Sequence, residues 1–151
     1  MKYLKVIFAV LFLCVDITFV NAQKLQSIVG HWEATRFDMM VDDMPISIDL
    51  RTGIASGISE GITISVPCEK LGFCDVRASY SFFADNTYSD YANFREITQE
   101  HGDYILRSNT ILCYINGELD EILKIISLTD MELILQNESE DGTITMYFDR
   151  K

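Results

Sequence analysis

The side chains in this sequence that could perform acid–base, metal or nucleophilic chemistry are few and widely spaced. Histidine occurs only at His31 and His101. A zinc site would need both rings to meet a cysteine or a carboxylate, so one loop histidine and one strand histidine are the simpler interpretation. The sequence holds no Gly-x-Ser-x-Gly elbow, no phosphate-binding glycine loop and no His-Glu-x-x-His pair. We therefore expect no catalytic residue, no metal site, no cofactor and no enzymatic activity.

Aromatic and methionine side chains give a stronger indication of function than the potential catalytic or metal-binding residues do, and the function that they indicate is ligand binding. They recur on segments in which apolar and polar residues alternate, the pattern of strands with one buried face. Aromatic rings with one polar edge suit a small hydrophobic or amphipathic ligand, although the same side chains could simply fill a core. The candidate ligand-binding residues are Phe37, Met39, Tyr80, Phe82, Tyr104, Tyr114 and Met146.

The N-terminal segment has the features of an export signal. The first five residues carry two lysines, residues 6–15 are apolar without interruption, and Val20-Asn21-Ala22 offers compact residues to a signal peptidase. We expect residues 1–22 to be a signal peptide and residues 23–151 to form the mature domain. The protein would then be exported, to the periplasm or to the cell exterior.

Two membrane attachments compete with cleavage and export. The apolar run stops at Asp16 and falls well short of the roughly 20 residues that a spanning helix needs. Lipid attachment at Cys14 would require a small residue before the cysteine, where the sequence has the bulky Leu13. The sequence therefore predicts no membrane span.

Size and charge narrow the class of partner. Residues 23–151 suffice for one domain with a real core. The formal net charge of the whole chain is −11, and acids such as Asp120 and Glu121 are scattered among apolar residues, which indicates a solvated surface. Nucleic acids and anionic lipid surfaces should be repelled. The expected partner is a small hydrophobic or amphipathic molecule, or an unidentified protein.

Three cysteines follow the export signal, and an exported protein can keep disulfides. Three single pairings are possible. The pair Cys68 and Cys74 is favoured because Pro67 and Gly72 mark a turn that could bring their Cα atoms within bonding range. Cys113 lies in an apolar run and is interpreted as a small buried hydrophobe.

Short strand signals separated by turn residues continue almost to the C-terminus. The strongest hairpin signal is Asn116-Gly117, and Asp85-Asn86 marks another turn. About eight to ten strands are expected, without a long helix. They lie near residues 32–41, 45–50, 58–66, 76–82, from 87, 102–106, 110–115, 118–128, 131–136 and 144–148.

The segment from Asp38 to Cys74 is ambiguous. Its even positions between Met44 and Val66 are mostly apolar, which indicates strands. Glycine–isoleucine pairs also recur every four residues around Ile58, as in a short helix with an isoleucine stripe. Three glycines would make that helix costly, at about 1 kcal/mol each relative to alanine. We expect two strands here, with an undetermined connection.

Consecutive antiparallel strands must bury one face each and protect their edges, which a closed barrel or a sandwich can achieve. The run of short hairpins favours an all-β, antiparallel up-and-down barrel, because a Greek-key sandwich needs longer crossing connections. Trp32 occupies an even position and Phe37 an odd one, so in a regular strand their side chains would face opposite sides. If both side chains point into the barrel, a β-bulge must lie between them.

Four short motifs occur in order along most of the mature chain. They are Gly30-His31-Trp32, Phe83 to Tyr88, Gly102-Asp103-Tyr104 followed by Ser108 to Ile111, and Ile126 to Leu133. In this order and spacing the chain resembles small secreted bacterial lipocalin-like domain proteins. The resemblance implies an eight-stranded or similar barrel, in which Gly30 lets the chain enter the first strand and Trp32 plugs the closed end.

The sequence as a whole predicts an exported lipocalin-like barrel that binds a small hydrophobic or amphipathic molecule in its mouth or cavity. The alternative is a protein-binding module, such as an inhibitor or a surface-assembly partner, with a filled core and its contacts on residues 38–74. An apolar cavity of a few hundred Å³ would favour the first function, and a filled interior the second.

Overall fold

The computed structural model describes residues 27–72, 76–93, 96–139 and 142–151. Eleven antiparallel strands account for most of this part of the chain, with one short 3-10 turn, η1 (Cys68–Leu71). The strands are β1 (Gly30–Val41), β2 (Met44–Asp49), β3 (Ile54–Ser59), β4 (Ile62–Pro67), β5 (Arg77–Phe82), β6 (Thr87–Asn93), β7 (Ile97–Arg107), β8 (Thr110–Ile115), β9 (Glu118–Leu128), β10 (Glu132–Ser139) and β11 (Gly142–Arg150).

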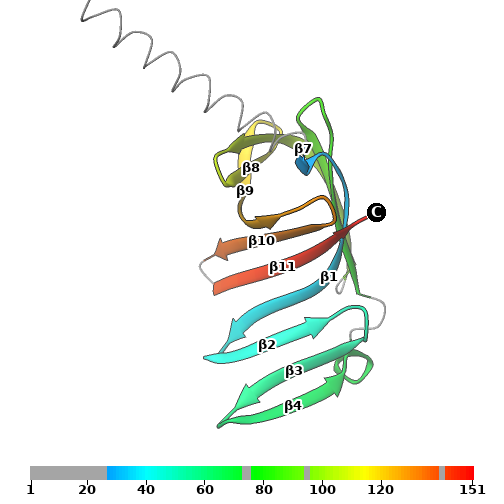
Figure 1. Cartoon of the computed structure of the whole chain (residues 1–151), viewed down its shortest axis with the longest axis vertical. Helices are drawn as coiled ribbons and strands as arrows, with labels where there is room; N and C mark the ends of the chain where they lie inside the picture. The colour runs from blue at the N-terminus through cyan, green and yellow to red at the C-terminus, as the bar shows by residue number, and fades with distance from the viewer. Residues whose placement is uncertain (1–26, 73–75, 94–95, 140–141) are drawn as a thin grey trace, which may run out of the picture.

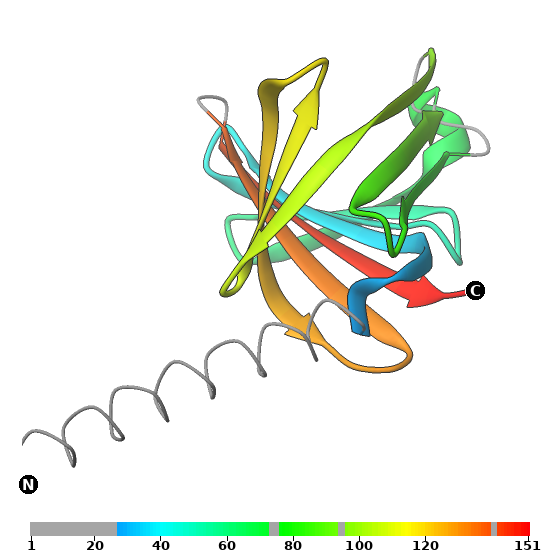
Figure 2. The same ribbon diagram turned by 90° about the horizontal axis from the view of Figure 1, so that it is seen from above.

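Eight of these strands close into a barrel. Strands β5 to β11 pair in sequence order, β5 pairs with β1, and the pairing of β11 with β1 completes the ring. Figure 2 shows the barrel strands crossing one another around a common interior. The all-β, up-and-down barrel expected from the sequence is confirmed.

The other three strands form a sheet extension that leaves the barrel wall. One side of β1 pairs with β5 over Gly30–Glu33 and with β2 over Arg36–Val41. Strands β3 and β4 continue the sheet outward from β2, and Figure 1 shows them below β1, β10 and β11. We call β2, β3 and β4 the extension. The point at which β1 changes partner is called the fork.

The structure corrects the expectation for residues 38–74. Three strands form where two were expected, near 45–50 and 58–66, and the alternative helix does not form. Glu60 and Gly61 have φ values of 51° and 78°, the left-handed pair of a two-residue hairpin, so this turn divides the expected second strand. Cross-strand pairing overrides the four-residue glycine spacing, because glycine weakens a helix.

The bulge expected between Trp32 and Phe37 is confirmed. The register of β1 against β11 shifts between Ala34 and Arg36, which makes Thr35 the extra residue. The Thr35 hydroxyl donates a hydrogen bond to the Tyr147 carbonyl oxygen at 3.2 Å. The bulge lies at the fork, where the other side of β1 changes from β5 to β2.

Trp32 packs within the buried cluster of the barrel, and its role as the plug of the closed end stays a prediction from the resemblance. Its ring is fully buried, and its Nε1 donates a hydrogen bond to the Ile28 carbonyl oxygen at 2.7 Å. The Arg150 guanidinium lies 4.3 Å above the ring and donates to the Val29 carbonyl oxygen at 3.1 Å. Gly30 has φ +149°, and a Cβ there would lie 3.2 Å from Arg150. A side chain at position 30 would therefore strain the entry to β1.

A single cluster of buried side chains fills much of the barrel interior. Within it the Phe82 and Tyr104 rings meet edge to face at 5.1 Å, a favourable aromatic geometry. The buried members are Ile28, Trp32, Ala34, Tyr80, Phe82, Tyr88, Tyr104, Ile111, Cys113, Leu123, Ile125, Leu133, Leu135, Met146 and Phe148.

Candidate functional site

Most of the candidate ligand-binding residues lie in the packed interior. Phe82 and Tyr104 are fully buried, Tyr80 and Met146 are nearly so, and Phe37 packs against the same cluster. These side chains contact one another, as a packed core requires. The cavities described below are lined by other residues, apart from Met39.

Two candidate residues lie away from that cluster. Met39 is half-buried against a second small core at the base of the extension. Tyr114 pairs with Asp103 on β7, whereas the preceding Cys113 pairs with the buried Tyr104. Since neighbouring strand residues face opposite sides, Tyr114 lies on the outer face of the barrel. The expectation that Tyr114 points into the barrel is wrong.

A half-buried carboxylate lies near Tyr80. Glu121 accepts a hydrogen bond from the Tyr80 hydroxyl at 2.7 Å and another from Asn137 Nδ2 at 2.5 Å. Burial raises the pKa of Glu121, the two hydrogen bonds oppose that shift, and the negative charges of Asp90 and Asp120 add to it. The interpretation of Glu121 as a solvated surface acid is therefore wrong.

The register explains why the sequence did not indicate this orientation. Glu121 pairs with the buried Cys113 in the regular part of the β8–β9 register, two residues from the pair of Leu123 with Ile111, and the shift between Cys113 and Tyr114 comes only after it. An irregularity of one residue exchanges the faces of the residues beyond it. The pairing partner decides which acid of the Asp120–Glu121 pair faces inward.

We expect Glu121→Gln to stabilise the protein increasingly as the pH rises. Because the pKa of Glu121 is raised in the folded state, folded wild type binds a proton more readily than unfolded wild type. This contribution is fully present at low pH and is lost as the pH rises through the raised pKa. Urea unfolding between about pH 4 and pH 8 would measure the difference between the two proteins. Glu118→Gln, at the exposed start of β9, is the matched control.

A difference in unfolding free energy between the two proteins that stays constant over this range would show that the Glu121 carboxylate is not desolvated. A difference that decreases toward high pH would show that folding lowers the pKa of Glu121.

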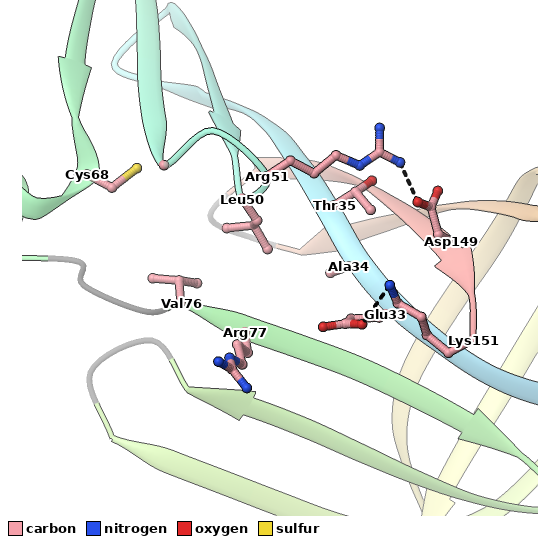
Figure 3. A pocket seen from close by; sticks show the side chains of 11 residues that line it. Glu33, Ala34, Thr35, Leu50, Arg51, Cys68, Val76, Arg77, Asp149 and Lys151 are labelled. Carbon is pink, nitrogen blue, oxygen red and sulfur yellow. Dashed lines mark hydrogen bonds and ion pairs between the residues drawn. The ribbon is translucent and has the colours of Figure 1, made fainter.

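A polar hollow of about 490 Å³ lies at the fork, and we call it the fork cleft. Figure 3 shows that β1 supplies one side, the β2–β3 turn a second and the start of β5 a third. The turn is held by Asp49, whose carboxylate accepts hydrogen bonds from the backbone amides of Arg51 at 2.8 Å and Thr52 at 3.1 Å. The lining residues are Glu33, Ala34, Thr35, Leu50, Arg51, Gly53, Cys68, Val76, Arg77, Asp149 and Lys151.

Charge in the fork cleft is unevenly neutralised. Arg51 forms an ion pair with Asp149, and Lys151 Nζ lies 3.2 Å from a carboxylate oxygen of Glu33. Arg77 forms no ion pair with an acid of the described residues. The cleft therefore gathers three cationic and two anionic side chains, although the chain as a whole carries a charge of −11.

Apolar side chains line the inner part of the fork cleft. Leu50 and Val76 project toward each other from opposite walls, as Figure 3 shows, and Ala34 lies between them on β1. The Cys68 thiol is also buried there. Burial raises the pKa of Cys68, the Asp49 charge adds to this, and a backbone hydrogen bond opposes it. A thiol kept protonated is a poor nucleophile.

A second hollow, of about 500 Å³, crosses the outer face of the sheet formed by β11, β1, β2 and β3. Met40 and Ile58 are exposed along it, and Pro45 lies between them in the register. Met39 also contributes to its lining. The hollow is a shallow surface groove, in contrast to the three-sided fork cleft.

The two histidines do not meet. His31 Nδ1 lies 2.8 Å from Ser81 Oγ on the exposed outer face, and His101 pairs with Ser89 two strands further on. Three strand spacings separate the backbones of the two histidines by about 14 Å. No group of three potential metal ligands is found within the described part of the chain.

The expected disulfide is not seen at Cys68. Cys68 and Cys113 are both buried and carry free thiols, while Cys74 lies outside the described residues. Pairing of Cys68 with Cys74 therefore stays a prediction. The interpretation of Cys113 as a small buried hydrophobe is confirmed by its full burial.

The expected signal peptide, residues 1–22, also lies outside the described residues. Over the residues that are described, no helix is long and apolar enough to cross a membrane.

Comparison with known proteins gives a distant structural likeness. No protein-family model and no curated protein matches the chain. The NMR structure of a protein from Bacteroides uniformis ATCC 8492 is similar with a TM-score of 0.49 and 20% sequence identity, over 83% of this chain and 90% of that chain. The strand pairing itself shows that the chain is a closed eight-stranded antiparallel β-barrel with a three-stranded extension, a fold compatible with a lipocalin-like protein.

Proposed function

We propose that this protein is an exported, non-enzymatic binding protein for a small amphipathic anion. The ligand would occupy the fork cleft, with its anionic group on Arg77 and its apolar part against Leu50 and Val76. This proposal moves the binding site from the barrel interior, where packed side chains take up the space, to the cleft beside it. Export to the periplasm or cell exterior rests on the N-terminal sequence pattern.

The observation that carries the proposal is the composition of the fork cleft. Its volume of about 490 Å³ falls within the range of small-molecule sites, roughly 300 to 1,000 Å³. Arg77 offers a guanidinium that no described acid neutralises, and guanidinium groups bind carboxylates and phosphates through paired hydrogen bonds. An apolar chain next to such a group would displace water from Leu50 and Val76.

We expect octanoate to bind the wild-type protein and Arg77→Gln to weaken that binding about tenfold, the loss of one charge-assisted contact. Isothermal titration calorimetry would measure both affinities. Arg107→Gln is the matched control, because Arg107 is exposed on β7 and does not line the cleft. Octyltrimethylammonium has the same chain length and the opposite charge, so it tests whether the cleft prefers an anionic to a cationic ligand.

Equal affinities for the two amphiphiles, or equal losses in the Arg77 and Arg107 variants, would contradict the proposed site. Native mass spectrometry of protein purified from its own source would then show whether any small molecule is bound.

A protein-binding module is the second candidate function, and the extension favours it. Such contacts were expected on residues 38–74, and the described part of this segment forms strands with exposed apolar side chains, among them Ile58, Ile62 and Ile64. Exposed apolar patches of this kind are typical of interaction surfaces. Competition between octanoate and a partner would distinguish a shared site from two independent ones.

A further inference from the structure

We propose that β4 pairs with β4 of a second copy of this chain. The two strands would run antiparallel around a two-fold axis through Ile64, so that two extensions become one continuous sheet. The pairing is independent of the fork cleft and of its ligand.

The first observation is an open sheet edge. Strand β4 pairs with β3 and with no other strand of those described. Natural sheets protect such edges with charges, prolines or bulges. The register of β3 with β4 runs without a bulge from Ile54–Pro67 to Ser59–Ile62, and no charged residue occurs between Gly61 and Cys68. Only Pro67, at the very end of the strand, removes a backbone donor.

The second observation identifies the free backbone groups. The Cys68 amide donates a hydrogen bond to the Gly53 carbonyl oxygen at 2.8 Å, so Cys68 points toward the β3 side. In an antiparallel ladder this direction alternates along the strand. The amides and carbonyls of Thr63 and Ser65 therefore point outward, away from β3. They are two donors and two acceptors that a neighbouring strand can satisfy.

One self-pairing register satisfies every outward donor and acceptor of both residues, because it does not set either of them opposite Pro67, which has no amide hydrogen. With Thr63 of one copy opposite Ser65 of the other, the two-fold axis produces four backbone hydrogen bonds. The same register places Ile62 opposite Val66 and Ile64 opposite Ile64. Thr–Ser and β-branched aliphatic pairs are favourable across strands, and no like charges meet.

The third observation concerns charge. At −11 per chain, two copies repel each other at long range, and a neutral strand is the surface at which they can approach. Added salt would screen this repulsion and leave the strand pairing intact. We therefore expect a weak dimer, with a Kd of about 0.1 mM, whose population rises with ionic strength.

Disulfide trapping tests the register. Opposed residues of a non-hydrogen-bonded antiparallel pair have Cα atoms about 4.5 Å apart, within the range for a disulfide. Ile64→Cys should form covalent dimers on mild oxidation. Ile62→Cys alone should not, because the two cysteines at position 62 of the two chains would lie about 13 Å apart. A mixture of Ile62→Cys and Val66→Cys should cross-link. The unaltered chain gives the background from the native cysteines.

Sedimentation equilibrium tests the association itself with a matched pair of variants. Ile64→Lys places two like charges together on the axis and should abolish the dimer. Ile58→Lys makes the same change on β3 at nearly the same exposure, 50% against 54%, and should leave the dimer formed.

Three outcomes would overturn the proposal. One is a wild-type chain that stays monomeric at about 1 mM and high salt. Another is cross-linking of Ile62→Cys as readily as Ile64→Cys. The last is a chain that does not self-associate and whose Thr63 and Ser65 amides exchange hydrogen more slowly only when an unrelated extended peptide is added.

Discussion

Gly102→Ala is expected to destabilise the protein by about 3 kcal/mol or more, enough to leave many barrels of this size largely unfolded. An added Cβ at position 102 would lie 2.1 Å from the Tyr114 carbonyl oxygen and 2.8 Å from Tyr88 Cε1. The closer contact is with backbone of the paired strand β8, which cannot move without disturbing the ladder. Urea unfolding followed by tryptophan fluorescence would measure the loss.

The matched control is Gly57→Ala on β3. Its Cβ would meet Met44 Sδ at 3.4 Å, an ordinary contact with a flexible side chain. We expect a change within about 0.5 kcal/mol for this variant. Equal costs at positions 57 and 102 would show that the close approach of β7 to β8 is not required for folding.

Trp32→Ala is expected to cost about 3 to 5 kcal/mol, as for other deletions of a buried aromatic side chain. The ring is fully buried, and its loss would also remove the hydrogen bond to the Ile28 carbonyl oxygen and the cation–π contact with Arg150. Trp32 is the only tryptophan of the chain, so far-ultraviolet circular dichroism must replace fluorescence in the measurement.

Trp32→Phe keeps an aromatic ring beneath Arg150 and removes the Nε1 hydrogen bond. Its cost should be clearly smaller than that of Trp32→Ala. If the two variants unfold at the same urea concentration, Trp32 stabilises the fold mainly through its hydrogen bond to Ile28 and not through the volume of its ring.

The bulge in β1 links the fold to the candidate site. A bulge bends its strand and increases the local twist. Thr35 is the extra residue, and the Leu50 amide donates to the Thr35 carbonyl oxygen at 2.9 Å, so the β2–β3 turn is attached to β1 beside the bulge. Strand β5 pairs only with the part of β1 before it. The fork cleft is therefore a consequence of where β1 bends.

Local signals in the sequence were sufficient for the hairpins of the barrel. Asn116 and Gly117 adopt φ values of 54° and 83°, and Asn86 adopts 66°, the left-handed conformations that these residue types accept. The even and odd positions of Trp32 and Phe37 were enough to indicate the bulge between them. These features depend on neighbours a few residues apart, which a sequence displays directly.

The sequence by itself determined that this chain folds as antiparallel strands and that they close into a barrel. Tertiary structure alone decided that β1 forks between β5 and β2, that Glu121 faces inward while Tyr114 faces outward, and that Arg77 lines a cleft. The physical reason is that alternation and turn residues act locally, whereas the partner and register of a strand depend on residues far away in the sequence. A one-residue shift in that register exchanges the faces of every residue beyond it.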